Sequence, residues 1–213
     1  AFPYVNGGLF ADENIEIPPF TEDLKTLLLS NASEDFNWSE ISPTIFGAVF
    51  ESTLNPETRR SGGMHYTSIE NIHKVIDPLF FDGLKAELEE ARGKTVAGGA
   101  RSKAIQAFHE KLSKLTFLDP ACGSGNFLTE TYLSLRRLEN EIIREIYSGI
   151  EGQMAMGEMA AEIMDSLEIK VSIGQFYGIE INDFAVTVAK TALWIAESQM
   201  LKETEEIVHM HMD

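Results

Sequence analysis

The spacing of apolar residues divides the chain into a mostly helical first half and a second half in which strands and helices alternate. In the first half, apolar positions recur at helical intervals, most clearly over residues 69–92 and 101–114. Ser68 is a good N-cap for the first of these stretches, and Pro78 is expected to kink or restart it.

In the second half, short apolar runs at 115–119 and 175–181 predict strands, the first of them buried. Each is followed by a helical pattern, and the last helix is expected to end near residue 201. Strands separated by helices are typical of a parallel sheet, so the pattern predicts an α/β fold.

Composition limits the partners that the chain can hold by itself. It carries 17 basic and 34 acidic side chains, a net charge of −17. Such a chain lacks the broad positive face that a phosphate backbone requires, so any nucleic acid must be held by other parts of the protein. Cys122 is the single cysteine, which excludes an internal disulfide and fits a cytoplasmic protein. No apolar run reaches the roughly 18 residues of a membrane span, and no membrane partner is expected.

The segment FLDPACGSGNF places an acid at the end of the first predicted strand, then two glycines, then a helix start. Glycines let a ligand approach the backbone closely, and the helix N-terminus offers free N–H groups. The third glycine of the dinucleotide fingerprint is replaced by Leu128, and no Gly-Lys-Ser/Thr follows as in a phosphate-binding P-loop. Asp119 would repel phosphates, so the loop suits a ligand with an amine and a cationic centre.

A second acid, Glu180, ends the next predicted strand in FYGIEIND. An acid at this place in an α/β sheet can hold ribose hydroxyls. It follows Asp119 by 61 residues, whereas about 20 is usual. A helical insertion at about 150–170, with a helical pattern over residues 153–166, accounts for the excess.

These segments, followed by AKTALWIAE, resemble the S-adenosylmethionine-dependent DNA N6-adenine methyltransferases. The resemblance is closest to the large bacterial restriction–modification and phage-defence enzymes. Upstream, residues 62–78 resemble the family's tenth motif, except that Ser68 stands where the family commonly has proline. The resemblance covers roughly residues 43–201.

The resemblance implies S-adenosyl-L-methionine as cofactor, no metal, and a role for each matching residue. Asp119 would contact the methionine amino group, Glu180 the ribose hydroxyls, and Ile181 the adenine ring. The loop would wrap the methionine part, with Tyr66 and Thr67 beside its carboxylate. The expected cofactor-binding residues are Tyr66, Thr67, Asp119, Ala121, Gly123, Gly125, Glu180 and Ile181.

The resemblance also predicts the domain organisation. Residues 1–112 form a mostly helical N-terminal region, and residues 113–213 the start of a Rossmann-like cofactor-binding domain, truncated after its second strand. The family's catalytic segment is Asn/Asp-Pro-Pro-Tyr/Phe, and Ile17-Pro18-Pro19-Phe20 lacks the side-chain acceptor at its first position. We therefore expect that the chain is a piece of a longer DNA methyltransferase, without catalytic residues of its own, and is inactive alone. Double-stranded DNA would be bound through the rest of that protein.

Other interpretations remain open from the sequence. An enzyme of the same fold could methylate RNA or protein, and a degenerate cofactor fold could serve as a non-catalytic interaction module. Asp119 and its glycines could form a plain strand-to-helix turn, and Glu180 could be a solvated strand-end acid. Cys122 is interpreted as a small residue in a tight loop rather than a nucleophile.

Overall fold

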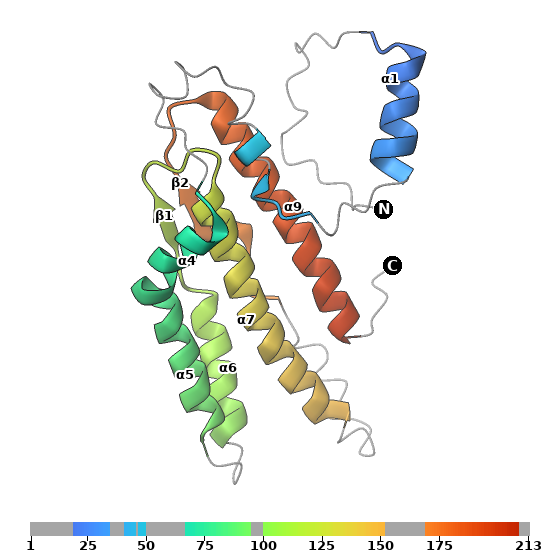
Figure 1. Cartoon of the computed structure of the whole chain (residues 1–213). Helices are drawn as coiled ribbons and strands as arrows, with labels where there is room; N and C mark the ends of the chain where they lie inside the picture. The colour runs from blue at the N-terminus through green and yellow to red at the C-terminus, as the bar shows by residue number, and fades with distance from the viewer. Residues whose placement is uncertain are drawn as a thin grey trace.

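The computed structural model describes residues 19–34, 41–45, 47–49, 67–94, 100–151 and 169–208. Within them, helices pack against one face of a small two-stranded parallel sheet (Figure 1). The helices are α1 (Glu22–Thr26), α4 (Ile69–Ile76), α5 (Asp82–Arg92), α6 (Ala100–Leu112), α7 (Asn126–Glu151) and α9 (Asp183–Val208), with π-helical turns at Leu27–Glu34 and Asp77–Phe81. The strands are β1 (Phe117–Asp119) and β2 (Phe176–Gly178).

The two strands pair in parallel, as the sequence predicts. Phe117 lies opposite Phe176, Leu118 opposite Tyr177, and Asp119 opposite Gly178. Both strands therefore end at the same edge of the sheet, and α7 and α9 begin from the loops that follow. This confirms the alternation of strand and helix in the second half.

The hydrophobic core fills the space between the sheet and α5, α6, α7 and α9. The rings of Phe117 and Phe176 stack at 5.2 Å between centroids, and Tyr132 of α7 meets Phe176 edge-on at 5.5 Å. α7 and α9 run side by side along much of their length (Figure 1). The core thus anchors one face of the sheet on α7.

The other face of the sheet is uncovered by the described residues. Leu118 is 63% exposed and its partner Tyr177 is 54% exposed. The expectation that the first strand is buried is therefore wrong for this face. Side chains alternate across a strand, so Phe117 enters the core while Leu118 points away from it.

The second strand is shorter than the predicted 175–181 at both ends: it begins one residue later, because Gln175 is used in a turn, and it ends at Gly178. Residues Ile173–Gln175 form a 3₁₀ turn before β2. The buried Gln175 amide donates to the carbonyls of Leu112 and Leu115 at 2.8 Å, which ties this turn to the end of α6. Glu180 therefore lies two residues beyond β2. The last helix extends to Val208, past the predicted end near 201.

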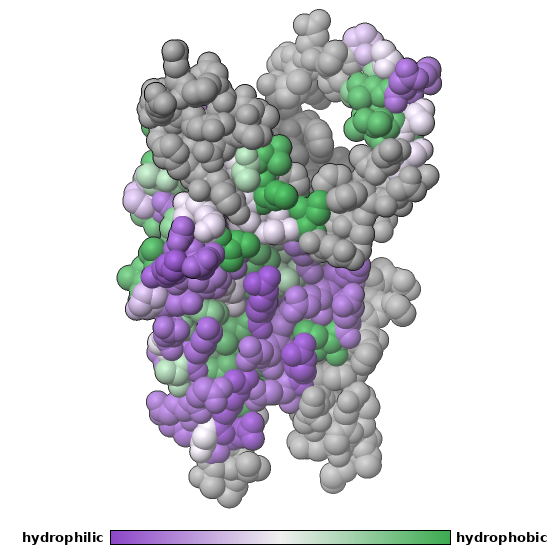
Figure 2. Space-filling view, in the orientation of Figure 1, coloured by the Kyte–Doolittle hydropathy of each residue, from purple (hydrophilic) through white to green (hydrophobic). Residues whose placement is uncertain are grey.

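The N-terminal helices follow the predicted signals. Ser68 caps α4 by accepting from Asn71 N–H at 3.4 Å, and Pro78 lies in the π-helical turn that separates α4 from α5. The visible surface of the lower half is largely hydrophilic, whereas apolar residues gather on the first helix (Figure 2). In the π-helical turn that continues this helix, the side chains of Leu27, Leu28 and Leu29 are exposed. The predicted helix at 153–166 lies outside the described residues.

Candidate functional site

The loops after the two strands are joined by backbone hydrogen bonds. Ile179 N–H donates to Asp119 O at 2.9 Å, and Cys122 N–H donates to Ile179 O at 3.0 Å. One further contact comes from a side chain, because Gly123 N–H donates to Glu180 Oε2 at 3.0 Å. The structure therefore places the Asp119–Gly125 loop and Glu180 side by side, at the edge of the sheet where ligands of α/β proteins bind.

Both glycines of the loop have the left-handed conformation that glycine favours, but their surroundings differ. Gly123 has φ +54°, and a Cβ added there would meet no atom within 4 Å. Gly125 has φ +77°, and a Cβ there would lie 2.7 Å from Ala189 Cβ on α9. Gly123 thus faces open space where a ligand can approach the backbone, while Gly125 allows α9 to pack against the loop.

The Glu180 carboxylate holds three backbone donors. Oε1 accepts from Ile181 and Asn182 N–H, both at 2.8 Å, and Oε2 accepts from Gly123 N–H. A carboxylate offers about four acceptor positions, so about one remains. One ribose hydroxyl can bind beside Gly123 N–H, but two would require Glu180 to release a backbone donor.

Asp119 organises the start of the loop in a similar way. Its Oδ1 accepts from Ala121 N–H at 3.0 Å. Between the two acids lies Cys122, and burial, together with the negative charges of Asp119 and Glu180, raises the pKa of its thiol. The protonated thiol is a poor nucleophile, which agrees with a packing role.

Ile181 follows Glu180 and is 93% exposed, and Phe184 on the first turn of α9 is 60% exposed. Both large apolar side chains therefore lie outside the core, and both follow Glu180 closely in the sequence. Ile181 therefore offers an apolar surface on which the flat ring of a ligand could pack when the ligand's hydroxyl groups bind Glu180. Phe184 was not among the sequence candidates, although its place at the start of a helix next to Glu180 is visible in the sequence.

The tenth-motif-like segment is described only in part. Tyr66 lies outside the described residues. Thr67 is partly buried and directly precedes the Ser68 cap of α4, which packs on α7. Six expected residues, Asp119, Ala121, Gly123, Gly125, Glu180 and Ile181, thus form one site, and Thr67 lies on an adjoining element.

Sequence reasoning missed Gly47. A Cβ at this position would lie 2.6 Å from Asn126 Oδ1 and closer still to Ser124 Oγ. The helical residues around Gly47 therefore pack directly on the loop and on the first turn of α7. A glycine between apolar residues in a helical pattern, as in Ile45 to Val49, was the available signal for a close backbone approach.

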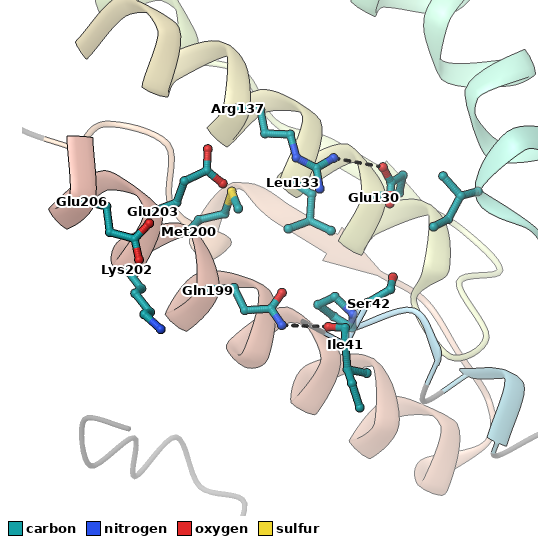
Figure 3. A pocket seen from close by; sticks show the side chains of 12 residues that line it. Ile41, Ser42, Glu130, Leu133, Arg137, Gln199, Met200, Lys202, Glu203 and Glu206 are labelled. Carbon is teal, nitrogen blue, oxygen red and sulfur yellow. Dashed lines mark hydrogen bonds and ion pairs between the residues drawn. The ribbon is translucent and has the colours of Figure 1, made fainter. Parts of the chain in front are cut away.

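A separate cavity of about 470 Å³ opens between α7 and α9 (Figure 3). It contains none of the expected cofactor residues. Charged side chains line much of it, including Glu130 and Arg137, whose charged atoms are 3.6 Å apart. On the opposite side, Gln199 Nε2 donates to Ile41 O at 2.8 Å. The residues that line the cavity are therefore distinct from those of the loop site.

The loop site fits S-adenosyl-L-methionine chemically. The cofactor carries an ammonium group, a sulfonium centre and ribose hydroxyls, for which the site offers two carboxylates. Its carboxylate group suits the backbone N–H groups at a helix N-terminus, such as that of α7. The open space at Gly123 leaves room for close approach. Among the described residues, no group of three or more potential metal ligands is present, and no helix is long and apolar enough to cross a membrane.

Comparisons with known proteins agree with this assignment. The family model of the MmeI DNA-methyltransferase domain matches residues 94–212. DNA methyltransferase A of Bacillus subtilis (strain 168) is 41% identical over 208 residues, which is 98% of this chain and 21% of that protein. A solved structure of the Type IIL restriction-modification enzyme MmeI in complex with DNA is 40% identical, with a TM-score of 0.78 over 99% of this chain.

The chain spans 26% of the MmeI chain in that structure and about a fifth of the Bacillus relative. The region matched by the family model includes β1, β2, α7 and α9, and with them the loop site. The family match covers more than half of the 213 residues. The chain therefore belongs to the MmeI DNA-methyltransferase-domain family.

Proposed function

We propose that this chain is the S-adenosylmethionine-binding part of a site-specific DNA adenine-N6 methyltransferase of a restriction–modification or phage-defence system. The observation that carries the proposal is the contact between Gly123 N–H and Glu180 Oε2. It joins a glycine loop and a second acid at the ends of adjacent parallel strands. Membership of a DNA-methyltransferase family supports the same function.

Each residue of the site has a distinct task in the proposal. Asp119 accepts from the methionine ammonium group, and Glu180 accepts from a ribose hydroxyl at the remaining position on Oε2. Ile181 packs on the adenine ring, and the Ala121–Gly125 backbone wraps the methionine part. Tyr66 and Thr67 lie beside its carboxylate. When bound, the cofactor supplies an electrophilic methyl group on a sulfonium centre.

The proposed architecture is a Rossmann-like domain that starts near residue 113. The two parallel strands, each followed by a long helix, support this assignment. We assign residues 1–112 to a mostly helical N-terminal region, and the packing of α4 and α6 on α7 supports its close association with the cofactor-binding domain. No segment of the 213 residues provides Asn/Asp-Pro-Pro-Tyr/Phe, so we assign adenine methylation to the full-length protein and not to this chain alone.

A methyltransferase of the same fold that acts on RNA or protein is the second candidate. The names of the Bacillus relative and of MmeI favour DNA. A non-catalytic module is less favoured, because both loop glycines have positive φ and the space at Gly123 is open to a ligand.

The test is methyl transfer by the full-length protein to unmethylated genomic DNA, followed by digestion to nucleosides and mass spectrometry. We expect N6-methyldeoxyadenosine from the wild type and almost none from Asp119→Ala. Lys74→Gln, on the surface of α4, serves as the matched control and should retain activity. Methylated cytosine in the DNA, or methyl transfer only to RNA or protein, would contradict the adenine assignment. The 213-residue chain alone should transfer no methyl group to DNA.

A further inference from the structure

His73 on α4 lies between two carboxylates that belong to different elements. Its Nδ1 is 2.8 Å from Asp77 Oδ1 in the turn after α4. Its Nε2 is 3.1 Å from Glu130 Oε1 on α7. The imidazole therefore connects the helix that follows Thr67 to the helix that follows the glycine loop.

Both ring nitrogens face acceptors, which determines the charge state that fits this geometry. A neutral imidazole has one N–H donor, so one of the two carboxylates would face a lone pair. The imidazolium has two donors and satisfies both. The contact is thus strongest when His73 is protonated.

Glu130 is well suited to be the fixed end of this bridge. Its side chain is 3% exposed, and it lies one turn beyond Asn126, where α7 begins. On its other side, Arg137 Nη1 lies 3.6 Å away at the wall of the cavity (Figure 3). Asp77, Glu130 and Arg137 are thus the charged groups around the bridge that the described elements supply. The buried carboxylate cannot turn into water, so it holds His73 in place.

We propose that His73 is a positioning residue for the cofactor site, which holds the Thr67 end of α4 against the first turns of α7 through Glu130. This inference rests on the proposed function. It adds a residue that touches neither the loop nor the expected cofactor contacts. The protonated side chain thereby adds a hydrogen-bonded link between α4 and α7 to the packing of these two helices.

The coupling has a definite pH dependence. The hydrogen bond with Asp77 raises the pKa of His73 above 6.5, burial opposes this, and Glu130 raises it further. A raised pKa in the folded state means that the stabilisation is fully present below pH 6.5 and is lost as the pH rises through the folded-state pKa. Cofactor affinity should therefore benefit from His73 at pH 6 and not at pH 9.

The experiment measures the dissociation constant of S-adenosylmethionine by calorimetry for full-length wild type and His73→Gln, at pH 6 to 9. The ratio of the two constants removes the titration of the cofactor's own amino group. We expect His73→Gln to bind about fivefold more weakly at pH 6 and equally at pH 9. Lys74→Gln, the adjacent residue with an exposed ion pair to Glu70, should bind like wild type at every pH.

Hydrogen exchange without cofactor gives a second readout. Amides of residues 72–76, the hydrogen-bonded part of α4, should exchange faster in His73→Gln than in wild type at pH 6, and no faster at pH 9. If His73→Gln does not fold, Asp77→Asn provides the same comparison, because it removes one of the two carboxylates. Wild-type binding with a ratio near one at pH 6 and unchanged exchange would overturn the positioning role. Absence of wild-type binding would instead overturn the proposed function.

Discussion

In the proposed function, Glu180 has two tasks that compete for the same oxygen atoms. Without a ligand, its carboxylate holds the backbone of Gly123, Ile181 and Asn182. Those bonds fix the loop in a shape that leaves Gly123 open, so the site is formed before any ligand binds. A ligand with two hydroxyls gains less than two full hydrogen bonds, since one backbone donor must be released.

The two glycines allow a matched prediction for stability and binding. Gly125→Ala should lower the free energy of unfolding by about 2–4 kcal/mol, because it adds strain at φ +77° and a clash with Ala189. Gly123→Ala should cost only about 1–2 kcal/mol, because its Cβ meets open space. Urea unfolding of the full-length protein measures both.

Cofactor binding should rank the two glycine variants differently. The added methyl group at Gly123 occupies the space proposed for the ligand, so Gly123→Ala should weaken binding although it stays folded. Equal losses of stability in both variants, with unchanged cofactor affinity for Gly123→Ala, would contradict the roles assigned to the two glycines.

Glu139 on α7 provides the clearest pH prediction for stability. It is fully buried and contacts Arg136, accepts from Lys170 N–H at 2.6 Å, and lies 2.6 Å from His109 Nε2. Burial raises its pKa, but His109, Arg136 and the backbone outweigh burial and lower the pKa below 4.5. A lowered pKa means that this stabilisation is present above pH 4.5 and is lost as the pH falls through the folded-state value.

Glu139→Gln should therefore destabilise the protein by about 3–5 kcal/mol at pH 7, because it leaves the buried Arg136 charge without its partner. The difference from wild type should narrow below pH 4.5 as Glu139 itself becomes protonated. Glu141→Gln, an exposed neighbour on α7, is the control and should change stability by less than about 1 kcal/mol. A difference that stays constant from pH 7 to 3 would show that the Glu139 charge is not the cause.

At the scale of elements, α4 offers a test of the departure at Ser68. The backbone of Ser68 has φ −65° and ψ 151°, which proline also adopts. Ser68→Pro removes a long capping hydrogen bond of 3.4 Å but restricts the unfolded chain. We expect the variant to keep its helix content by circular dichroism and its free energy of unfolding within about 1 kcal/mol. A loss of several kcal/mol would mean that Ser68 donates a contact that proline cannot replace.

Elements that depend on local signals were predictable from the sequence. Ser68 as a cap, Pro78 as an interruption and the strand–glycine–helix order at Asp119 all occur as expected. Features that depend on distant partners were not predictable. The exposure of Leu118 depends on which face α7 covers, and the start of β2 depends on the bonds from Gln175 to the end of α6.

In the candidate site too, features with local sequence signals were predictable and features that depend on distant partners were not. The adjacency of Asp119 and Glu180 follows from two parallel strands, and the sequence was sufficient to predict it. The contact of Gly47 with Asn126 and the His73 bridge join segments that are more than 50 residues apart, without a local pattern to mark them. Such contacts require the packed structure.

At the scale of the whole molecule, charge and length separate cofactor binding from DNA binding. A net charge of −17 disfavours a duplex on this chain alone, and the chain spans about a fifth to a quarter of its relatives. The described residues nevertheless contain a loop, two acids and an exposed apolar side chain at one edge of the sheet. The cofactor site is therefore the part of the proposed function that these residues can be tested for directly.

The most direct test of this claim is the dissociation constant of S-adenosylmethionine for the full-length protein and its Glu180→Ala variant. Charge-assisted hydrogen bonds of about 1.5–3 kcal/mol predict that Glu180→Ala raises the constant about tenfold or more. Glu203→Ala, on α9 and outside the loop site, should leave it within about twofold, and thermal unfolding checks that both variants are folded. A folded Glu180→Ala variant that binds the cofactor as tightly as wild type would contradict the assignment of the site.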